Sequence, residues 1–190
     1  MNKINESDAL GCAFYMVDYA YKNGIEYQLS GIKMNQLLYI AQGIHLGLYN
    51  KPMFEDKIEK CGLGIQIESI TKEFMRYGGL TIPSNFMDFN NYFYGIGIDV
   101  PNYKKHIVNE KSHNLFTYFY YRNDNLPQEK TEILKGIVLE LSKFSTTSLT
   151  RKFVFESLAY EMMCEKKSNF IDCNDLQREY ENRLKQGEKE

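Results

Sequence analysis

The segment from Ser30 to Tyr49 constrains the fold most, because its apolar residues recur every three or four positions in one broad stripe. This spacing predicts a helix that starts near Ser30 and stops at Asn50-Lys51-Pro52, where proline cannot continue it. It is the most hydrophobic helix that the sequence predicts, which indicates a largely helical fold. The stripe consists of Met34, Leu37, Leu38, Ala41, Ile44, His45 and Leu48.

Further helices follow from the same periodicity and from capping residues at their ends. Ser7 can cap a first helix that ends at Asn23-Gly24, and a third covers Glu68 to Tyr77 before Gly78-Gly79. Later helices are expected to begin at three positions, namely Pro127, Thr147 (running on through Leu149, Phe153, Phe155, Leu158 and Met162) and Asp172.

The stretch from Leu80 to Asn114 shows weaker periodicity, because prolines, asparagines and glycines interrupt an aromatic run. Aromatic and β-branched content predicts a strand over 115–121, with 94–100 as its candidate partner. The expected fold class is therefore mostly α (α+β), a compact helical domain with a small antiparallel sheet. Residues 1–171 are expected to form one domain, with signature 12–79, aromatic loop and strands 80–121 and helices 127–164; residues 172–190 add a helix and, beyond Leu184, a solvated tail.

Composition excludes several classes of protein. The 190 residues are 43% hydrophobic and 25% charged, as in ordinary globular proteins, and the formal net charge of −2 gives no general attraction to a phosphate backbone. No apolar run approaches the roughly 20 residues that cross a bilayer, and the first residues lack a signal-peptide pattern. Four cysteines stand far apart without a Cys-x-x-Cys pair, so reduced thiols are expected. These features favour a cytoplasmic protein.

The sequence shows no convergent set of catalytic or metal-binding groups. Its three histidines, His45, His106 and His113, have none of the spacings that bind zinc, and the Gly62-Leu63-Gly64 stretch lacks the residues of a phosphate loop. We therefore expect no cofactor and no metal, and an enzyme that uses His106 or His113 with nearby acids is the third-ranked hypothesis.

Residues 32–43 (IKMNQLLYIAQG), followed by Lys51-Pro52-Met53-Phe54 and Ile58-Glu59, resemble the Panacea antitoxin domain, which is also called SocA-like. The resemblance runs without gaps from about Cys12 to Gly79, with LLY-x-AQG and KP-x-F at the separation found in the family. Beyond Gly79 it fades.

Several positions depart from the family pattern. Cys61 replaces a tryptophan, Gly64-Ile65-Gln66-Ile67-Glu68 replaces Gly-Pro-Val-Val-Pro, and Asn35-Gln36 replaces Gln-Lys. The family's histidine near the C-terminal helix is not evident around Val154. The lost prolines leave the entry to the third helix more adjustable, so the chain is expected to be a divergent member.

The resemblance implies a non-enzymatic module that neutralises a cognate toxin protein by direct binding. The alternative keeps the fold and makes the chain an inhibitor of a host defence system, carried by a phage or mobile element and similar to an anti-CRISPR protein, that binds an effector or its guide RNA. The oligomeric state stays open. Candidate partner-binding residues lie on the polar edge of the second helix and in the aromatic loop: Lys33, Gln36, Gln42, His45, Tyr49, Phe89, Tyr92 and Tyr94.

Overall fold

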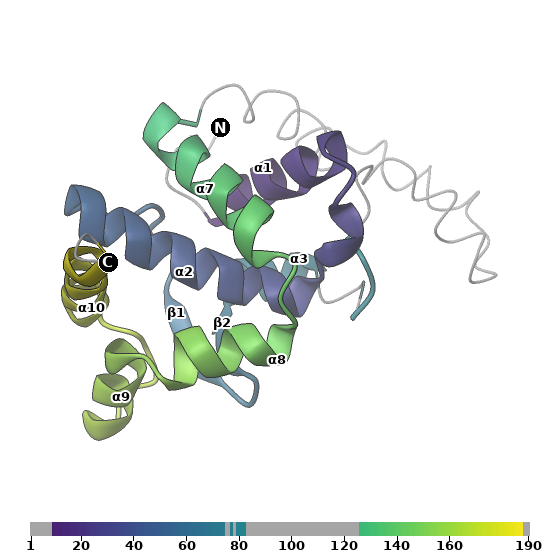
Figure 1. Cartoon of the computed structure of the whole chain (residues 1–190). Coiled ribbons are helices and arrows are strands. Elements are labelled where there is room, and N and C mark those ends of the chain that lie inside the picture. Colours follow the sequence, from purple (N-terminus) through teal and green to yellow (C-terminus); the bar gives the residue numbers. More distant parts are fainter. Residues whose placement is uncertain (1–8, 75–76, 78, 83–125, 188–190) are drawn as a thin grey trace, which may run out of the picture.

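The computed structural model describes residues 9–74, 77, 79–82 and 126–187, and this part of the chain consists of helices and one small sheet (Figure 1). The expected mostly α fold with a small antiparallel sheet is thereby confirmed. None of the helices in these ranges combines the length and the apolar character that crossing a bilayer requires. In chain order the helical elements are α1 (Ala9–Lys22), η1 (Glu26–Gln28), α2 (Gly31–Tyr49), α3 (Glu68–Phe74), α7 (Gln128–Leu141), α8 (Thr146–Leu149), η3 (Thr150–Phe155), α9 (Leu158–Glu165) and α10 (Cys173–Gly187).

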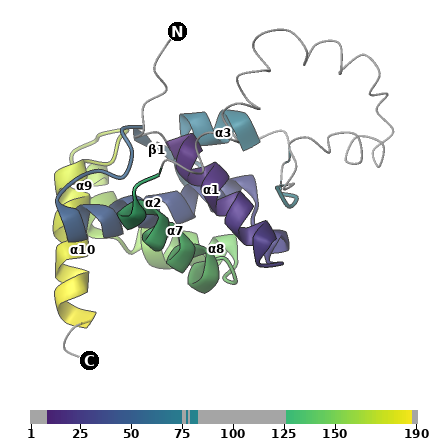
Figure 2. The ribbon, with the colours of Figure 1, turned by 90° about the horizontal axis from the view of Figure 1, so that it is seen from above.

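Helix α2 lies at the centre of the fold. Figure 1 shows it crossing the molecule between α7 and α8, and α10 packs along its C-terminal half (Figure 2). Ser30 caps its N-terminus and Asn50 ends it in the left-handed conformation at φ 54°. Both predicted ends are confirmed, and the helix buries residues on every side because other helices surround it.

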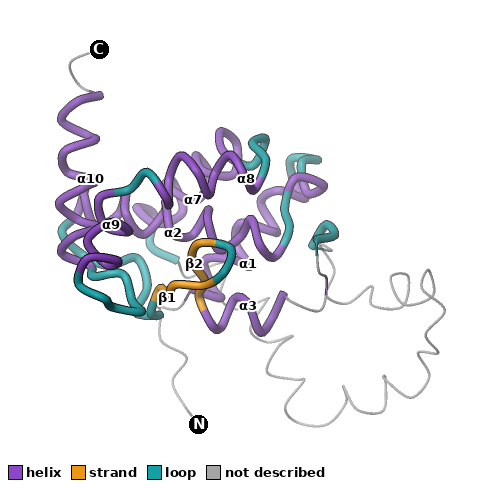
Figure 3. The backbone as a smooth tube through the Cα atoms, turned by 90° about the horizontal axis from the view of Figure 1, so that it is seen from below, coloured by secondary structure: helices purple, strands orange, loops and turns teal. Residues whose placement is uncertain are grey.

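The sheet is an antiparallel hairpin of β1 (Ile58–Cys61) and β2 (Gly64–Ile67), in which Ile58 pairs with Ile67 (Figure 3). The strands follow directly on the KPMF segment, where the sequence indicated only an extended piece and a glycine-bearing stretch. The predicted strands 94–100 and 115–121 lie outside the described residues. The third helix, α3, begins at Glu68 as predicted and buries Ile70 and Phe74; its predicted course to Tyr77 runs through residues 75 and 76, which lie outside the described ones.

The single helix predicted from Thr147 is wrong. Ser145 is the N-cap in place of Thr147, and the segment divides into α8, the π-helical turn η3 and α9, which Ser157 caps. A π-turn advances the chain by more residues per turn than an α-helix, so the 3.6-residue pattern loses its phase. Phe155, expected on the inner face, is consequently 52% exposed, and Val154 is buried.

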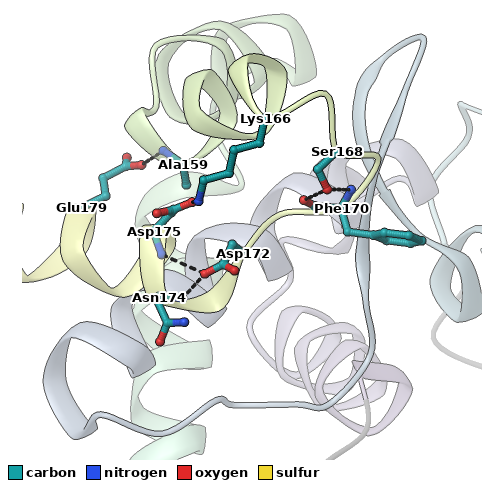
Figure 4. Close-up of polar contacts among 8 residues, drawn as sticks. All are labelled: Ala159, Lys166, Ser168, Phe170, Asp172, Asn174, Asp175 and Glu179. Carbon is teal, nitrogen blue, oxygen red and sulfur yellow. Dashed lines mark hydrogen bonds and ion pairs between the residues drawn. The ribbon is translucent and has the colours of Figure 1, made fainter.

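The connection from α9 to α10 is held by polar contacts (Figure 4). Asp172 accepts hydrogen bonds from the backbone N–H of Asn174 and Asp175, as predicted for the α10 cap. Asp175 also forms an ion pair with Lys166, at the end of α9. Helix α10 continues to Gly187, three residues past the predicted end at Leu184. The proposed division of the chain between residues 171 and 172 stays a prediction.

Helices α2 and α10 pack closely because α2 presents glycine at the contact. A Cβ atom at Gly43 would overlap the ring of Tyr180, which is 4% exposed. A Cβ atom at Gly47 would lie 3.0 Å from Tyr180 Cβ. Glycine thus sets the distance between the two helices.

Substitution of Gly43 by alanine is expected to lower the free energy of unfolding by about 2 kcal/mol or more, because the Tyr180 ring has to move out of its packed position. Gly136→Ala is the matched control, since Gly136 lies inside α7 with open space around it and alanine favours helix there by about 0.5–1 kcal/mol. Denaturant unfolding of both variants measures the two effects. Equal stability of the two variants would contradict the packing argument.

Candidate functional site

The five candidate residues on α2 divide into buried and accessible side chains. Gln36, Gln42 and His45 are 0%, 1% and 2% exposed, whereas Lys33 is half-buried and Tyr49 is 43% exposed. The sequence placed them on a polar edge, but neighbouring elements cover much of that edge. Burial gives several of these side chains a structural role, and partner contact by any of them stays a prediction.

Gln42 holds the segment that follows α2. Its Oε1 accepts hydrogen bonds from the backbone N–H of Met53 at 2.7 Å and of Phe54 at 3.2 Å, and its Nε2 donates to the Phe54 carbonyl at 3.0 Å. The side chain therefore satisfies the buried backbone groups of Met53 and Phe54, which have to be paired in the protein interior. This contact explains physically why the glutamine of AQG and the KP-x-F segment occur at a set separation.

Asn35, which the sequence marked only as a departure from the family pattern, has a comparable role. Its Oδ1 accepts from the backbone N–H of Ile67 at 2.7 Å, and its Nδ2 donates to the Gly31 carbonyl at 3.1 Å. It therefore joins the start of α2 to the junction of β2 and α3. Only the fold shows that this amide is buried and contacts the end of a strand, because the sequence does not say which element lies beside Asn35.

His45 stabilises the turn after α2. Its Nδ1 lies 2.6 Å from the Lys51 carbonyl oxygen, and its ring packs 4.9 Å from that of Tyr49, centroid to centroid. Nε2 is buried and has no hydrogen-bond partner in the part of the chain that the structure describes. Burial lowers the pKa of the imidazole; the Lys51 carbonyl opposes this shift, and the charge of Lys130 adds to it. His45 is therefore held in its neutral form.

Lys33 connects α2 to the end of α7. Its Nζ donates a hydrogen bond to the carbonyl of Ser142, the C-cap of α7, at 2.8 Å. A cation at a helix C-terminus satisfies a free carbonyl and interacts favourably with the helix dipole. Burial lowers the pKa of this amine. The Lys33 ammonium group is thus engaged with the end of α7 and is less available to a partner.

Gln36 differs from the other buried amides. Both polar atoms of its side chain are buried and have no hydrogen-bond partner among the described residues, although Gln36 lies one turn from Tyr39, whose hydroxyl is 2.8 Å from Ser157 Oγ. An unpaired buried amide costs stability, so this glutamine does not hold the fold as Gln42 does.

The remaining candidates lie outside the described residues: Phe89, Tyr92 and Tyr94 of the aromatic loop, and the histidines His106 and His113. The four cysteines are all reduced, as expected. Within the described ranges, no three His, Cys, Asp or Glu side chains gather in a group that could hold a metal ion. On α2, most of the polar side chains that have a partner hydrogen-bond to the chain's own backbone, namely Lys33, Asn35, Gln42 and His45.

The fold and the motif contacts together define a small helical domain built around α2 and the segment after it. The family model for the antitoxin SocA-like Panacea domain matches residues 34–156, which are 123 of the 190 residues. The chain belongs to this family. The match starts at Met34 and continues to Glu156, well beyond Gly79, so the family pattern extends further toward the C-terminus than the sequence resemblance indicated. No curated protein and no solved structure matched the chain.

Methionine at positions 36 and 42 is expected to change stability in opposite directions. Gln36→Met removes an unpaired buried amide at similar volume and should raise the free energy of unfolding by about 1–2 kcal/mol. Gln42→Met leaves backbone groups of Met53 and Phe54 unpaired and should lower it by about 3 kcal/mol. Denaturant titration of both variants measures these changes. A loss of stability in Gln36→Met would show that its amide is satisfied in solution.

Stability is expected to fall as pH drops below about 6.5, the unfolded-state pKa of histidine. Because the folded state lowers the pKa of His45, the unfolded state binds the proton more readily, so stability is complete above this pH and declines toward the folded-state pKa. The slope is at most about 1.4 kcal/mol per pH unit. His45→Asn, whose amide can still donate to the Lys51 carbonyl, should flatten the profile between about pH 5 and 7. His106→Gln with His113→Gln serves as the control for the other imidazoles, and an unchanged slope in His45→Asn would refute the assignment.

Proposed function

We propose that this protein is an antitoxin that neutralises a cognate toxin by binding it directly, in the cytoplasm and without catalysing a reaction. Membership of the antitoxin SocA-like family, over most of the chain, is the observation that carries the proposal. The contacts of α2 support it, because Gln42 and His45 hydrogen-bond to the protein's own backbone and build a scaffold on which contact residues can be held.

Among the candidate contact residues on α2, those at its C-terminal end are the most exposed to a partner; we call this end the exit of α2. Leu48 is 50% exposed and Tyr49 is 43% exposed, and the His45 ring supports Tyr49 from inside. Aromatic side chains that are held in place and open to solvent are typical of the energetic centres of protein interfaces. Tyr49 is therefore the main contact that we propose on α2, and Phe89, Tyr92 and Tyr94 complete the set.

The test is a growth assay in which the chain is co-expressed with the product of the gene adjacent to its own. We expect the wild-type chain to restore growth and to co-purify with that product. Tyr49→Ser, and the triple variant of Phe89, Tyr92 and Tyr94 to serine, should each weaken binding by about tenfold or more. Tyr27→Ser, at a tyrosine that is 67% exposed, is the matched control and should bind normally. Absence of both rescue and binding by the wild-type chain would refute the proposal.

Salt dependence separates a protein partner from the guide RNA of the alternative hypothesis. Binding to RNA releases counterions, so it weakens steeply as salt rises, whereas a mainly apolar protein interface is less sensitive. A decline with salt that is much shallower than counterion release from RNA would cause is expected here. A steep loss of affinity, together with sensitivity to ribonuclease, would favour the RNA-binding inhibitor.

A further inference from the structure

A groove at the end of α7 has no role in the contacts described so far. It has a volume of about 620 Å³ and lies where the end of α7 meets α8 and η3. Phe144, which is 45% exposed, and Phe153 contribute apolar surface, and the rim carries three cations. We call it the η3 groove and define it by Lys143, Phe144, Ser148, Arg151, Lys152 and Phe153.

The backbone that shapes this groove is unusual. Thr150–Phe155 forms a π-helix, a rare conformation that proteins use mainly at functional sites. Gly64 of β2 packs against it with φ 107°, and a Cβ atom there would lie 3.0 Å from Thr150 Cγ2. The turn is thus supported from beneath, where Val154 is buried, while its outer residues Arg151 and Lys152 remain exposed.

The charges of the groove suit an acidic ligand. The cations Lys143, Arg151 and Lys152 line the groove together with two acids, in a chain whose net charge is −2. Lys152 Nζ lies 5.5 Å from the centroid of the Phe153 ring, and Arg183 approaches the same ring at 5.9 Å. An apolar surface with cations above it accommodates an apolar side chain flanked by carboxylates.

The two acids that line the groove, Glu140 and Glu156, are already paired with two of its cations. Glu140 lies 2.9 Å from Lys143, and Glu156 lies 3.4 Å from Arg151. All four side chains are more than half exposed, so water screens these pairs and a carboxylate of a partner can replace either acid. With three cations against two acids, the lining has too small an excess of positive charge to hold a continuous phosphate backbone, which favours a peptide with few carboxylates over a nucleic acid.

We propose that the η3 groove binds an acidic segment of the partner protein, with one apolar side chain against Phe144 and Phe153 and carboxylates at Arg151 and Lys152. The inference rests on the proposed function, and it adds a second contact surface to the exit of α2. A pocket of this size fits a single anchor and its neighbours, as at the energetic centre of many interfaces.

Short random peptides displayed on phage, selected on the full chain, provide a defined probe. We expect selected peptides to combine an aromatic or aliphatic residue with neighbouring Asp or Glu. Their affinity should fall about tenfold or more in the double variant Arg151→Glu, Lys152→Glu. The control, Lys22→Glu with Lys72→Glu, makes the same change in charge at exposed lysines outside the groove and should bind as the wild type does. Thermal unfolding of both double variants establishes that they fold.

Three results of the peptide and RNA binding experiments would overturn the inference. The first is selection of neutral or basic peptides only, and the second is equal peptide binding by the two double variants. The third is binding of an oligouridine RNA that Arg151→Glu, Lys152→Glu abolishes, which would make the groove a nucleic-acid site.

The growth assay separates this inference from the proposed function. If the wild-type chain and the groove variant rescue growth equally, the antitoxin function stands and the groove assignment fails; if the wild-type chain itself fails to rescue, the proposed function fails, while the peptide experiment still tests the groove.

Discussion

Gln42 makes three hydrogen bonds to the backbone of Met53 and Phe54, and the rest of the structure depends on this contact. A helix surrounded by other helices buries polar as well as apolar positions, and each buried polar group needs a partner. Gln42 meets this requirement and at the same time directs the chain from the end of α2 into the β1–β2 hairpin. The hairpin then supports both α3 and the η3 turn. One amide thus determines where several later elements lie.

The elements after Glu156 lie outside the family match, yet they close the core around α2. Helix α10 covers Gly43 and Gly47, and its Glu179 accepts a hydrogen bond from the backbone N–H of Ala159 in the first turn of α9 at 3.0 Å. Arg183 neutralises that carboxylate at 2.7 Å and also lies over the Phe153 ring. The C-terminal helices therefore stabilise the face that carries the η3 groove. Binding surfaces of this kind need a rigid support, since ordering a loose surface costs affinity.

The family assignment and the contact geometry bear on different parts of the molecule. The motif by which the family is recognised consists largely of buried residues, among them Gln42, which holds the segment after α2 to the helix. The surfaces proposed to meet a partner lie at the edge of that motif or outside it, at Tyr49 and in the η3 groove. A scaffold held by its own polar contacts leaves its exposed surface free to vary, because surface residues change with little effect on stability.

The sequence by itself determined the helices with a regular apolar stripe and a clear cap, such as α2 between Ser30 and Asn50, and it identified the family. It also placed Asp172 correctly at the start of α10. Local rules suffice there, because periodicity and capping involve residues that are near in the chain. Only the tertiary structure decided that Gln42 and His45 lie inside, that β1 pairs with β2, and that a π-turn exposes Phe155. Each of these outcomes depends on which distant element packs against a residue, for example α10 against Gly43 and Gly64 against Thr150, and short-range sequence patterns do not contain that information.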